Sequence, residues 1–193
     1  IQQVEAMKEM VNAFSEYART PDMELTEFNL NDVISEVAEL YHHELSLALE
    51  LSLETLPLIK ADAGRMRQVF HNLIRNALEA MGRSDDQQLK ISTQHTHDEG
   101  MGFIKIKVED NGPGFSDEIV EEVFDPYVTS KPKGTGLGLA IVKKLVEEHD
   151  GQITARNRKQ GGAEISILLP TIRKSEDELL FSKHRHDEKR DRA

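Results

Sequence analysis

A glycine-rich stretch in the last third of the chain has the residue types of a phosphate-binding loop. Residues 131–140 read Lys-Pro-Lys-Gly-Thr-Gly-Leu-Gly-Leu-Ala, and an amphipathic, helix-like pattern follows. Gly134, Gly136 and Gly138 lack a Cβ, so the backbone can turn sharply and bring the free N–H groups of a helix start close to an anion. Because spaced glycines also mark ordinary loop-to-helix junctions, this stretch alone leaves both interpretations open.

An acidic residue follows an alternating segment upstream of the glycines. Residues 103–108 read Phe-Ile-Lys-Ile-Lys-Val, which is typical of a strand, and Asp110-Asn-Gly-Pro-Gly-Phe comes next. Gly112 and Gly114 free the backbone there, so the Asp110 carboxylate can accept a hydrogen bond from a group lodged against the strand end. An exocyclic amine would suit this acceptor.

Two asparagines lie four residues apart in a segment with helical periodicity. Asn72 and Asn76 therefore share one helix face, and we expect both amides to look outward. The opposite face carries apolar residues at helical spacing: Val69, Phe70, Leu73, Ile74, Ala77, Leu78 and Met81. Either asparagine alone would fit an ordinary solvated position, so the pair matters only together with the two stretches above.

Taken in chain order, these motifs resemble the ATP-binding domain of sensor histidine kinases, in the superfamily that also contains the gyrase-type ATPases. The paired asparagines, Asp110 with its glycines, Phe124 with Lys131, and the glycine run correspond to that family's N, G1, F and G2 boxes. The resemblance covers about residues 25–170. The stretch Val11-Asn-Ala-Phe-Ser-Glu-Tyr-Ala-Arg-Thr-Pro21 further resembles the end of the dimerisation hairpin in nitrogen-regulation kinases of the NtrY type.

The resemblance implies that the chain binds ATP with Mg²⁺ and that a phosphoryl group is transferred. Asn72 and Asn76 would hold Mg²⁺ and act in catalysis with Lys131, and Asp110 would receive the amino group of adenine. The segment between Gly114 and Gly134 would cover the nucleotide. The residues expected to bind the nucleotide are Asn76, Asp110, Gly112, Gly114, Phe124, Lys131, Gly134, Thr135, Gly136, Leu137 and Gly138.

The same resemblance implies particular partners. The parent protein would form a homodimer through the helical hairpin, which would carry the acceptor histidine, and a response-regulator receiver domain would take the phosphoryl group next. The described motifs also leave two other functions open: a gyrase- or chaperone-like ATPase, and a module that binds nucleotide to regulate a partner. Asn72 favours the kinase over the hydrolase, because an amide is not basic enough to activate water.

The histidines do not supply the acceptor in our interpretation. His43 stands only 29 residues before Asn72, whereas the family's acceptor lies on the first hairpin helix, far upstream. His95 and His97 are expected in a hairpin loop without a third metal ligand, and His184 and His186 in a charged tail. We therefore expect the phosphoacceptor histidine to be absent from this sequence.

Composition limits the possible functions and locations. The 193 residues carry a net charge of −11 and contain no cysteine. The negative charge argues against general nucleic-acid binding, and the lack of cysteine excludes a disulfide framework. No apolar run approaches the length of about 20 residues that crosses a bilayer. We expect this fragment to be cytoplasmic. An inner-membrane anchor in the parent protein would be compatible with that location.

The predicted fold is α+β, a two-layer α/β sandwich with a mostly antiparallel mixed sheet. A partial dimerisation helix in residues 1–24 precedes the catalytic domain in residues 25–172, and a charged tail fills residues 173–193. Expected strands cover residues 47–53, 88–93, 103–108, 152–157 and 163–169. Expected helix signals are a cap at Asn31 or Asp32, a cap at Asp62 before the asparagines, a helical stretch in residues 116–124, and Gly151 as the end of the glycine-led helix.

Overall fold

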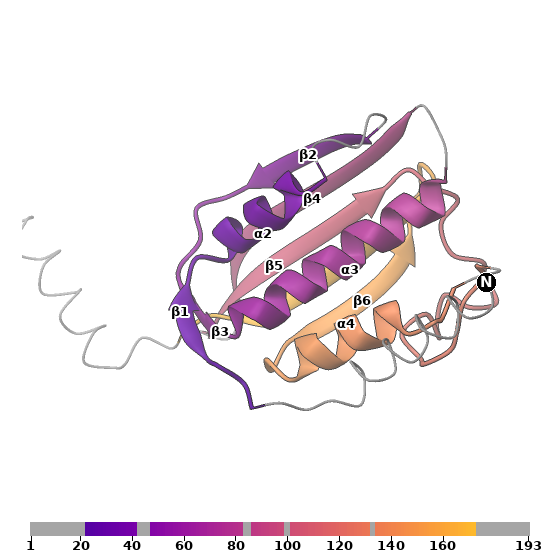
Figure 1. Ribbon diagram of the computed structural model, residues 1–193. Coiled ribbons are helices and arrows are strands. Elements are labelled where there is room, and N and C mark those ends of the chain that lie inside the picture. Colours follow the sequence, from indigo (N-terminus) through magenta and orange to yellow (C-terminus); the bar gives the residue numbers. More distant parts are fainter. Residues whose placement is uncertain (1–21, 42–46, 83–85, 99–100, 132–133, 173–193) are drawn as a thin grey trace, which may run out of the picture.

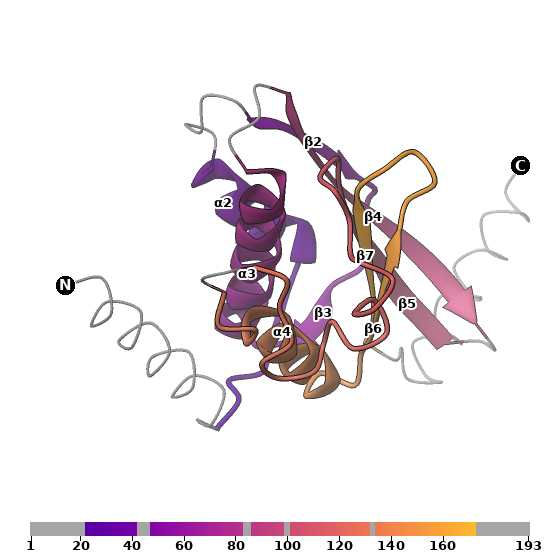
Figure 2. The ribbon, with the colours of Figure 1, turned by 90° about the vertical axis from the view of Figure 1, so that its right-hand side faces the viewer.

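The computed structural model describes residues 22–41, 47–82, 86–98, 101–131 and 134–172, and these form two layers. Helices α2 (Leu30–Glu39), α3 (Ala63–Met81) and α4 (Gly138–Glu147) lie along one face of a five-stranded sheet (Figures 1 and 2). The two-layer sandwich predicted from the sequence is confirmed. Residues 1–21 of the predicted dimerisation helix, the charged tail and His43 lie outside the described residues.

The large sheet is mixed and mostly antiparallel. In sheet order its strands are β2 (Leu47–Leu53), β4 (Gln87–Asp98), β5 (Met101–Asp110), β7 (Ala163–Pro170) and β6 (Gln152–Asn157). Only the β2–β4 pair of this sheet is parallel, and the other three pairs are antiparallel. This order places the end of β5 beside the start of β7, although more than fifty residues separate them along the chain.

A second, two-stranded sheet was not predicted. Strand β1 (Thr26–Phe28) pairs antiparallel with β3 (Ile59–Ala61), which immediately precedes α3. Ile59 and Ala61 are buried and Lys60 between them is exposed. Strands this short hold too few alternating positions to be recognised from the sequence.

The core lies between the helices and the sheet. The apolar face of α3 supplies Phe70 and Ile74, and α4 supplies Ile141, while Ile104 and Ile106 of β5 meet them from the sheet. Each of these side chains is almost completely removed from water, which stabilises the fold by roughly 1.5–3 kcal/mol per residue before entropic costs. The helical and alternating patterns of the sequence thus face each other as predicted.

Helix starts agree with the sequence in one case and differ in the other. The Asp62 carboxylate accepts a hydrogen bond from the Arg65 N–H (3.0 Å), so the predicted cap of α3 is confirmed. Helix α2 begins at Leu30, because the Asn29 side chain accepts from the Asn31 N–H (3.0 Å). The expectation of a cap at Asn31 or Asp32 was wrong by two or three positions.

His95 and His97 were expected in a hairpin loop, but both lie in strand β4. His95 pairs with Ile104 and His97 with Gly102, so β4 and β5 continue to Asp98 and Met101. Polar residues can extend a ladder in this way because the backbone makes the hydrogen bonds and the exposed end needs no apolar face. The imidazole rings of His95 and His97 lie on one face, with their centroids 4.4 Å apart.

The end of α4 also differs in detail from the prediction. Asp150, with φ of 56°, takes the left-handed position that was expected of Gly151. The Asp150 N–H donates to the Glu147 carbonyl and the Gly151 N–H donates to the Val146 carbonyl, both at 3.0 Å, as in a Schellman motif. Gly151 is needed for packing instead, because a Cβ there would lie 2.7 Å from the Leu169 side chain.

The helix predicted in residues 116–124 is a series of turns. The N–H groups of Ile119 and Val120 both donate to the Ser116 carbonyl, and no continuous helical pattern follows in this described segment. Val123 is the one buried residue there, at 4 % exposure. A helix would gain little packing from a single buried side chain, so turns are sufficient.

Candidate functional site

The asparagine helix and the glycine-rich loop meet where α4 begins. Helices α3 and α4 run side by side (Figure 1), and Gly138 is the first residue of α4. A Cβ on Gly138 would lie 3.2 Å from Asn76 Nδ2 and 3.3 Å from Asn76 Oδ1. The glycine therefore lets the start of α4 approach the amide more closely than a larger residue would.

Both asparagines carry a buried amide nitrogen that lacks a hydrogen-bond partner within the described part of the chain. These atoms are Asn72 Nδ2 and Asn76 Nδ2. A buried donor without an acceptor costs about 1–3 kcal/mol, so two of them on one helix face indicate that a ligand or water supplies the acceptors. Oxygen-rich groups such as phosphates would satisfy them.

Asn72 is more buried than the sequence suggested. It is only 5 % exposed, so our expectation of an outward-facing amide was wrong for this residue. Its Oδ1 accepts a hydrogen bond from Arg75 Nη2 at 3.4 Å, whereas Asn76 is half-buried. The sequence could place both residues on one face but could not show how closely neighbouring parts of the structure cover that face.

Asp110 is bound by backbone N–H groups at the end of β5. It is 8 % exposed, and its Oδ1 accepts hydrogen bonds from the Gly112 N–H (2.8 Å) and the Ala163 N–H (3.1 Å). Its Oδ2 has no hydrogen-bond partner among the described residues. One carboxylate oxygen is thus fixed by the backbone, and the other remains available to an amine.

The turn between β6 and β7 contributes residues that the sequence did not single out. Arg158 Nη1 donates to the Asp110 carbonyl at 2.6 Å. Gly162 has φ of 88°, and a Cβ there would lie 1.9 Å from the same carbonyl oxygen. The pair Gly161-Gly162 was the only signal for this contact, and it predicted a turn but not the strand end beneath it.

The loop after Asp110 is tied to the end of β6. Asn157 Oδ1 accepts from the Phe115 N–H (2.7 Å) and Asn157 Nδ2 donates to the Phe115 carbonyl (2.8 Å). A Cβ on Gly114 would lie 2.6 Å from Asn157 Oδ1. Asn157 therefore shapes the backbone that follows Asp110, although nothing in the sequence marked it.

Lys131 reaches across to α3. Its Nζ lies 2.7 Å from Glu79 Oε2 and 3.4 Å from the Asn76 carbonyl oxygen. Glu79 was not predicted as a site residue, although it stands one turn after Asn76 on the same helix. The structure thus brings Lys131, Asn76 and Gly138 together, as the motifs suggested.

The remaining predicted residues have different surroundings. Leu137 is fully buried, so only its backbone could contact a ligand, and its N–H lies 3.4 Å from Thr135 Oγ1. The Gly136 carbonyl accepts from the Tyr127 N–H at 3.0 Å, which joins the glycine loop to the preceding segment. Phe124 is half-buried, whereas its neighbour Val123 is buried.

A polar cluster fixes α3 and α4 at the end far from the glycine loop. His149 Nε2 accepts from the Asp62 N–H (3.0 Å), and its Nδ1 lies 2.7 Å from the Leu145 carbonyl oxygen. Arg65 forms ion pairs with Asp62 and with Glu148. Burial raises the pKa of Asp62, but hydrogen bonds from backbone N–H groups, that of Arg65 first, outweigh this and lower it below its usual value.

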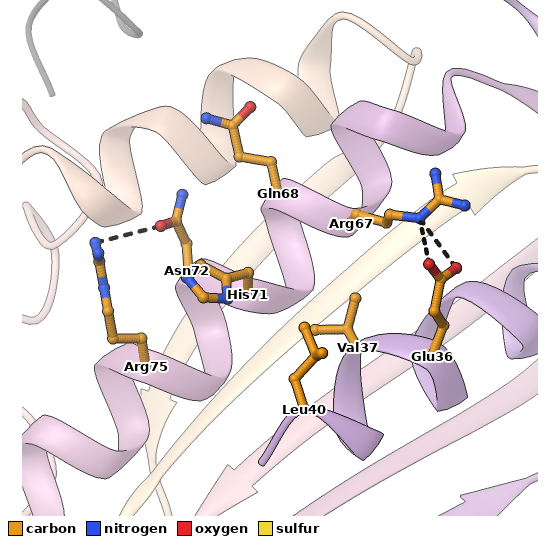
Figure 3. A pocket seen from close by; sticks show the side chains of 8 residues that line it. All are labelled: Glu36, Val37, Leu40, Arg67, Gln68, His71, Asn72 and Arg75. Atoms are coloured by element: carbon orange, nitrogen blue, oxygen red, sulfur yellow. Dashed lines mark hydrogen bonds and ion pairs between the residues drawn. The ribbon is translucent and has the colours of Figure 1, made fainter. Parts of the chain in front are cut away.

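A separate hollow of about 560 Å³ opens between α2 and α3 (Figure 3). Its lining contains no residue of the glycine loop, so it is distinct from the meeting point of Asn76 and Gly138. Asn72 forms part of its wall and points toward Arg75. The residues that line it are Glu36, Val37, Leu40, Arg67, Gln68, His71, Asn72 and Arg75.

Comparison with known proteins finds one family and several relatives. Residues 61–173 match the family described as histidine kinase-, DNA gyrase B-, and HSP90-like ATPase. The chain is 34 % identical over 179 residues to the sensor histidine kinase ZraS of Salmonella typhimurium, covering 91 % of this chain and 37 % of that protein. It is 33 % identical over 184 residues to an NtrY-like sensor histidine kinase of Rickettsia bellii, covering 94 % and 28 %.

Among solved structures, the histidine kinase ThkA is similar in two forms. Its nucleotide-free catalytic domain matches with a TM-score of 0.68 and 33 % identity, covering 77 % of this chain and 97 % of that one. Its complex with the response regulator TrrA matches with a TM-score of 0.73 and 28 % identity, covering 89 % and 49 %. The chain spans little more than a third of the length of ZraS, so it corresponds to one part of such a protein.

Proposed function

Because this chain belongs to the family of histidine kinase-, DNA gyrase B- and HSP90-like ATPases and is the ATP-binding catalytic domain of a sensor histidine kinase, we propose that ATP binds where α3 meets the glycine loop. This proposal is supported by the close approach of Gly138 to the Asn76 amide, whose nitrogen is buried without a partner among the described residues. Phosphate oxygens are the acceptors that such donors require.

Asp110 would read the base. Its free Oδ2 accepts from the amino group of adenine, while Oδ1 stays bound to Gly112 and Ala163. A carboxylate without a proton accepts but does not donate, so it favours a base with an amino group over one with a carbonyl at that position. The backbone contacts fix the carboxylate before the base arrives, which reduces the entropic cost of binding.

The side chains of Asn72 and Asn76 have the oxygen ligands that a magnesium ion requires. An amide oxygen is a ligand that Mg²⁺ accepts, and the ion commonly binds through one or two protein groups and the phosphates. We assign Asn76 as the main ligand, with Asn72 as the second. Asn72 would first have to release Arg75, whose guanidinium occupies its Oδ1 and repels a cation. When bound, the ion would neutralise charge on the triphosphate.

The reaction would be phosphoryl transfer from ATP to a histidine. An imidazole nitrogen of the acceptor attacks the γ-phosphorus, the bond to the β–γ bridging oxygen breaks, and ADP leaves. The protein contributes positioning and electrostatic stabilisation: the backbone N–H groups of Thr135, Gly136 and Gly138 and the Lys131 ammonium would face the phosphates. Asn72 does not act as a base in this scheme, because a neutral amide cannot accept a proton from the attacking imidazole.

Partners and location follow from the same proposal. The acceptor histidine would lie on a dimerisation hairpin whose final part is residues 1–24, in a homodimeric parent protein. A response-regulator receiver domain would then take the phosphoryl group, by analogy with the ThkA complex. The catalytic domain would comprise residues 25–172 and work in the cytoplasm, under a parent anchored in the membrane. No helix in the described ranges is long and apolar enough to cross a bilayer.

Phosphoryl transfer in trans tests this function. The full chain should bind Mg-ATP in calorimetry but should acquire no acid-labile label from γ-labelled ATP when incubated alone. Addition of a separate helical hairpin that carries the acceptor histidine should yield label on the hairpin, at low efficiency because proximity is lost. Label on this chain alone, or steady release of phosphate without the hairpin, would contradict the kinase assignment.

A further inference from the structure

Lys131 forms an ion pair with a residue of the helix that it faces. Its Nζ lies 2.7 Å from Glu79 Oε2, and the two side chains are 32 % and 48 % exposed. The Arg75 guanidinium lies farther from the same carboxylate, with its Nε at 3.8 Å from Oε1. The carboxylate therefore makes its closest ionic contact with the lysine that the proposed function assigns to the phosphates.

Backbone hydrogen bonds hold Lys131 in place and limit the region that its ammonium group can reach. The Lys131 N–H donates to Thr129 Oγ1 at 3.1 Å, and the Gly134 N–H donates to the Lys131 carbonyl at 3.1 Å. The residue is thus anchored at the base of the glycine loop, with its side chain against α3. Only rotation of the flexible side chain is needed to move the ammonium from Glu79 to a phosphate near Asn76.

We propose that Glu79 competes with the terminal phosphates of the nucleotide for Lys131 and thereby sets how strongly the site prefers nucleotides with more phosphates. The inference rests on the proposed function, because it takes the phosphates to lie between Asn76 and the glycine loop. In the free protein the Glu79 carboxylate offsets part of the positive charge of Lys131 and Arg75, which weakens their attraction for an approaching anion. With nucleotide bound, Lys131 exchanges one carboxylate for a more highly charged group.

The size of the effect follows from the exposure of the pair. A half-exposed ion pair changes an equilibrium constant by about 1.4- to 5-fold, since solvent screens it. Removal of the Glu79 charge would free Lys131 and also remove a negative charge near the phosphates, and both changes favour ATP. The effect should shrink as salt is added, because the screening length falls to about 8 Å at physiological ionic strength.

The test measures binding of ATP, ADP and adenosine, each with Mg²⁺, by calorimetry on the full chain. We expect Glu79→Gln to tighten ATP binding by about 2- to 5-fold, ADP less, and adenosine not at all. The control is Glu147→Gln, which makes the same charge change at the far end of α4 and should alter none of the three. In a Lys131→Met background, Glu79→Gln should give a clearly smaller gain.

Several outcomes would overturn the inference. Weaker or unchanged ATP binding in Glu79→Gln would show that Glu79 does not compete, and an equal gain with and without Lys131 would show that it acts on the phosphates directly. A parallel change in adenosine affinity would indicate a structural role for Glu79. If the unmodified chain bound none of the three ligands, the proposed function itself would be refuted, and the inference with it.

Discussion

Substitution of Asp110 by asparagine tests the adenine assignment with little disturbance of the fold. The change replaces Oδ2 with an N–H2 group and leaves Oδ1 able to accept from the Gly112 and Ala163 N–H groups, which now lie at 2.8 and 3.1 Å. Two neutral hydrogen bonds replace two charge-assisted ones, so the free energy of unfolding should fall by about 1 kcal/mol.

The affinity for ATP should fall much further. A hydrogen bond from the adenine amino group to a charged acceptor is lost, and two donors then face each other. The loss of such a bond costs about 1.5–3 kcal/mol, which corresponds to a roughly ten- to hundredfold higher Kd.

Inosine triphosphate makes the assay specific, because it has a carbonyl where ATP has the amino group. Asp110 should repel that carbonyl in the unmodified chain, whereas the new amide of Asp110→Asn can donate to it. Calorimetry should therefore show the preference for ATP over ITP reduced or reversed. Asp117→Asn, an equal charge change at an exposed position, serves as control. Unchanged ATP affinity, or equal losses for ATP and ITP, would refute the adenine assignment.

Three further predictions concern stability and ordering. Gly162→Ala should lower the free energy of unfolding by more than Gly161→Ala. Both positions have positive φ, which costs a non-glycine residue about 1–2 kcal/mol, but only at Gly162 would a Cβ also meet the backbone. Equal losses in urea titrations would contradict this. A hydrogen bond from Arg156 lowers the pKa of Glu164, so the stabilisation from Glu164 exists above its unfolded pKa and is lost as pH falls through the folded value. Acid titration should thus destabilise the unmodified chain more than Glu164→Gln. Amide exchange in residues 116–131 should slow when Mg-ATP is added, and equal exchange in both states would argue against a segment that covers the nucleotide.

Local patterns were sufficient for most secondary structure. The apolar face of α3, the Asp62 cap and the alternation of β5 were correctly predicted because each depends on residues within one or two turns or a few strand positions. The errors fall where local signals are weak. Strands β1 and β3 are too short to show a period.

Errors of a second kind arose where two residues could serve the same local role. At the start of α2, Asn29 and Asn31 are both good caps, and the backbone chose Asn29. At the end of α4, Asp150 took the left-handed position, and Gly151 lies where a Cβ would meet the Leu169 side chain.

By itself, the sequence determined which chemical groups belong to the site: a carboxylate after a strand, two amides on one helix face, and a glycine run that opens a helix. Only the tertiary structure decided what surrounds them. It placed Gly162 under Asp110, paired Lys131 with Glu79, and buried Asn72 beside Arg75. These contacts depend largely on the order of strands in the sheet and the packing of α3 between its neighbours, and such long-range pairings leave no periodic trace in the local sequence.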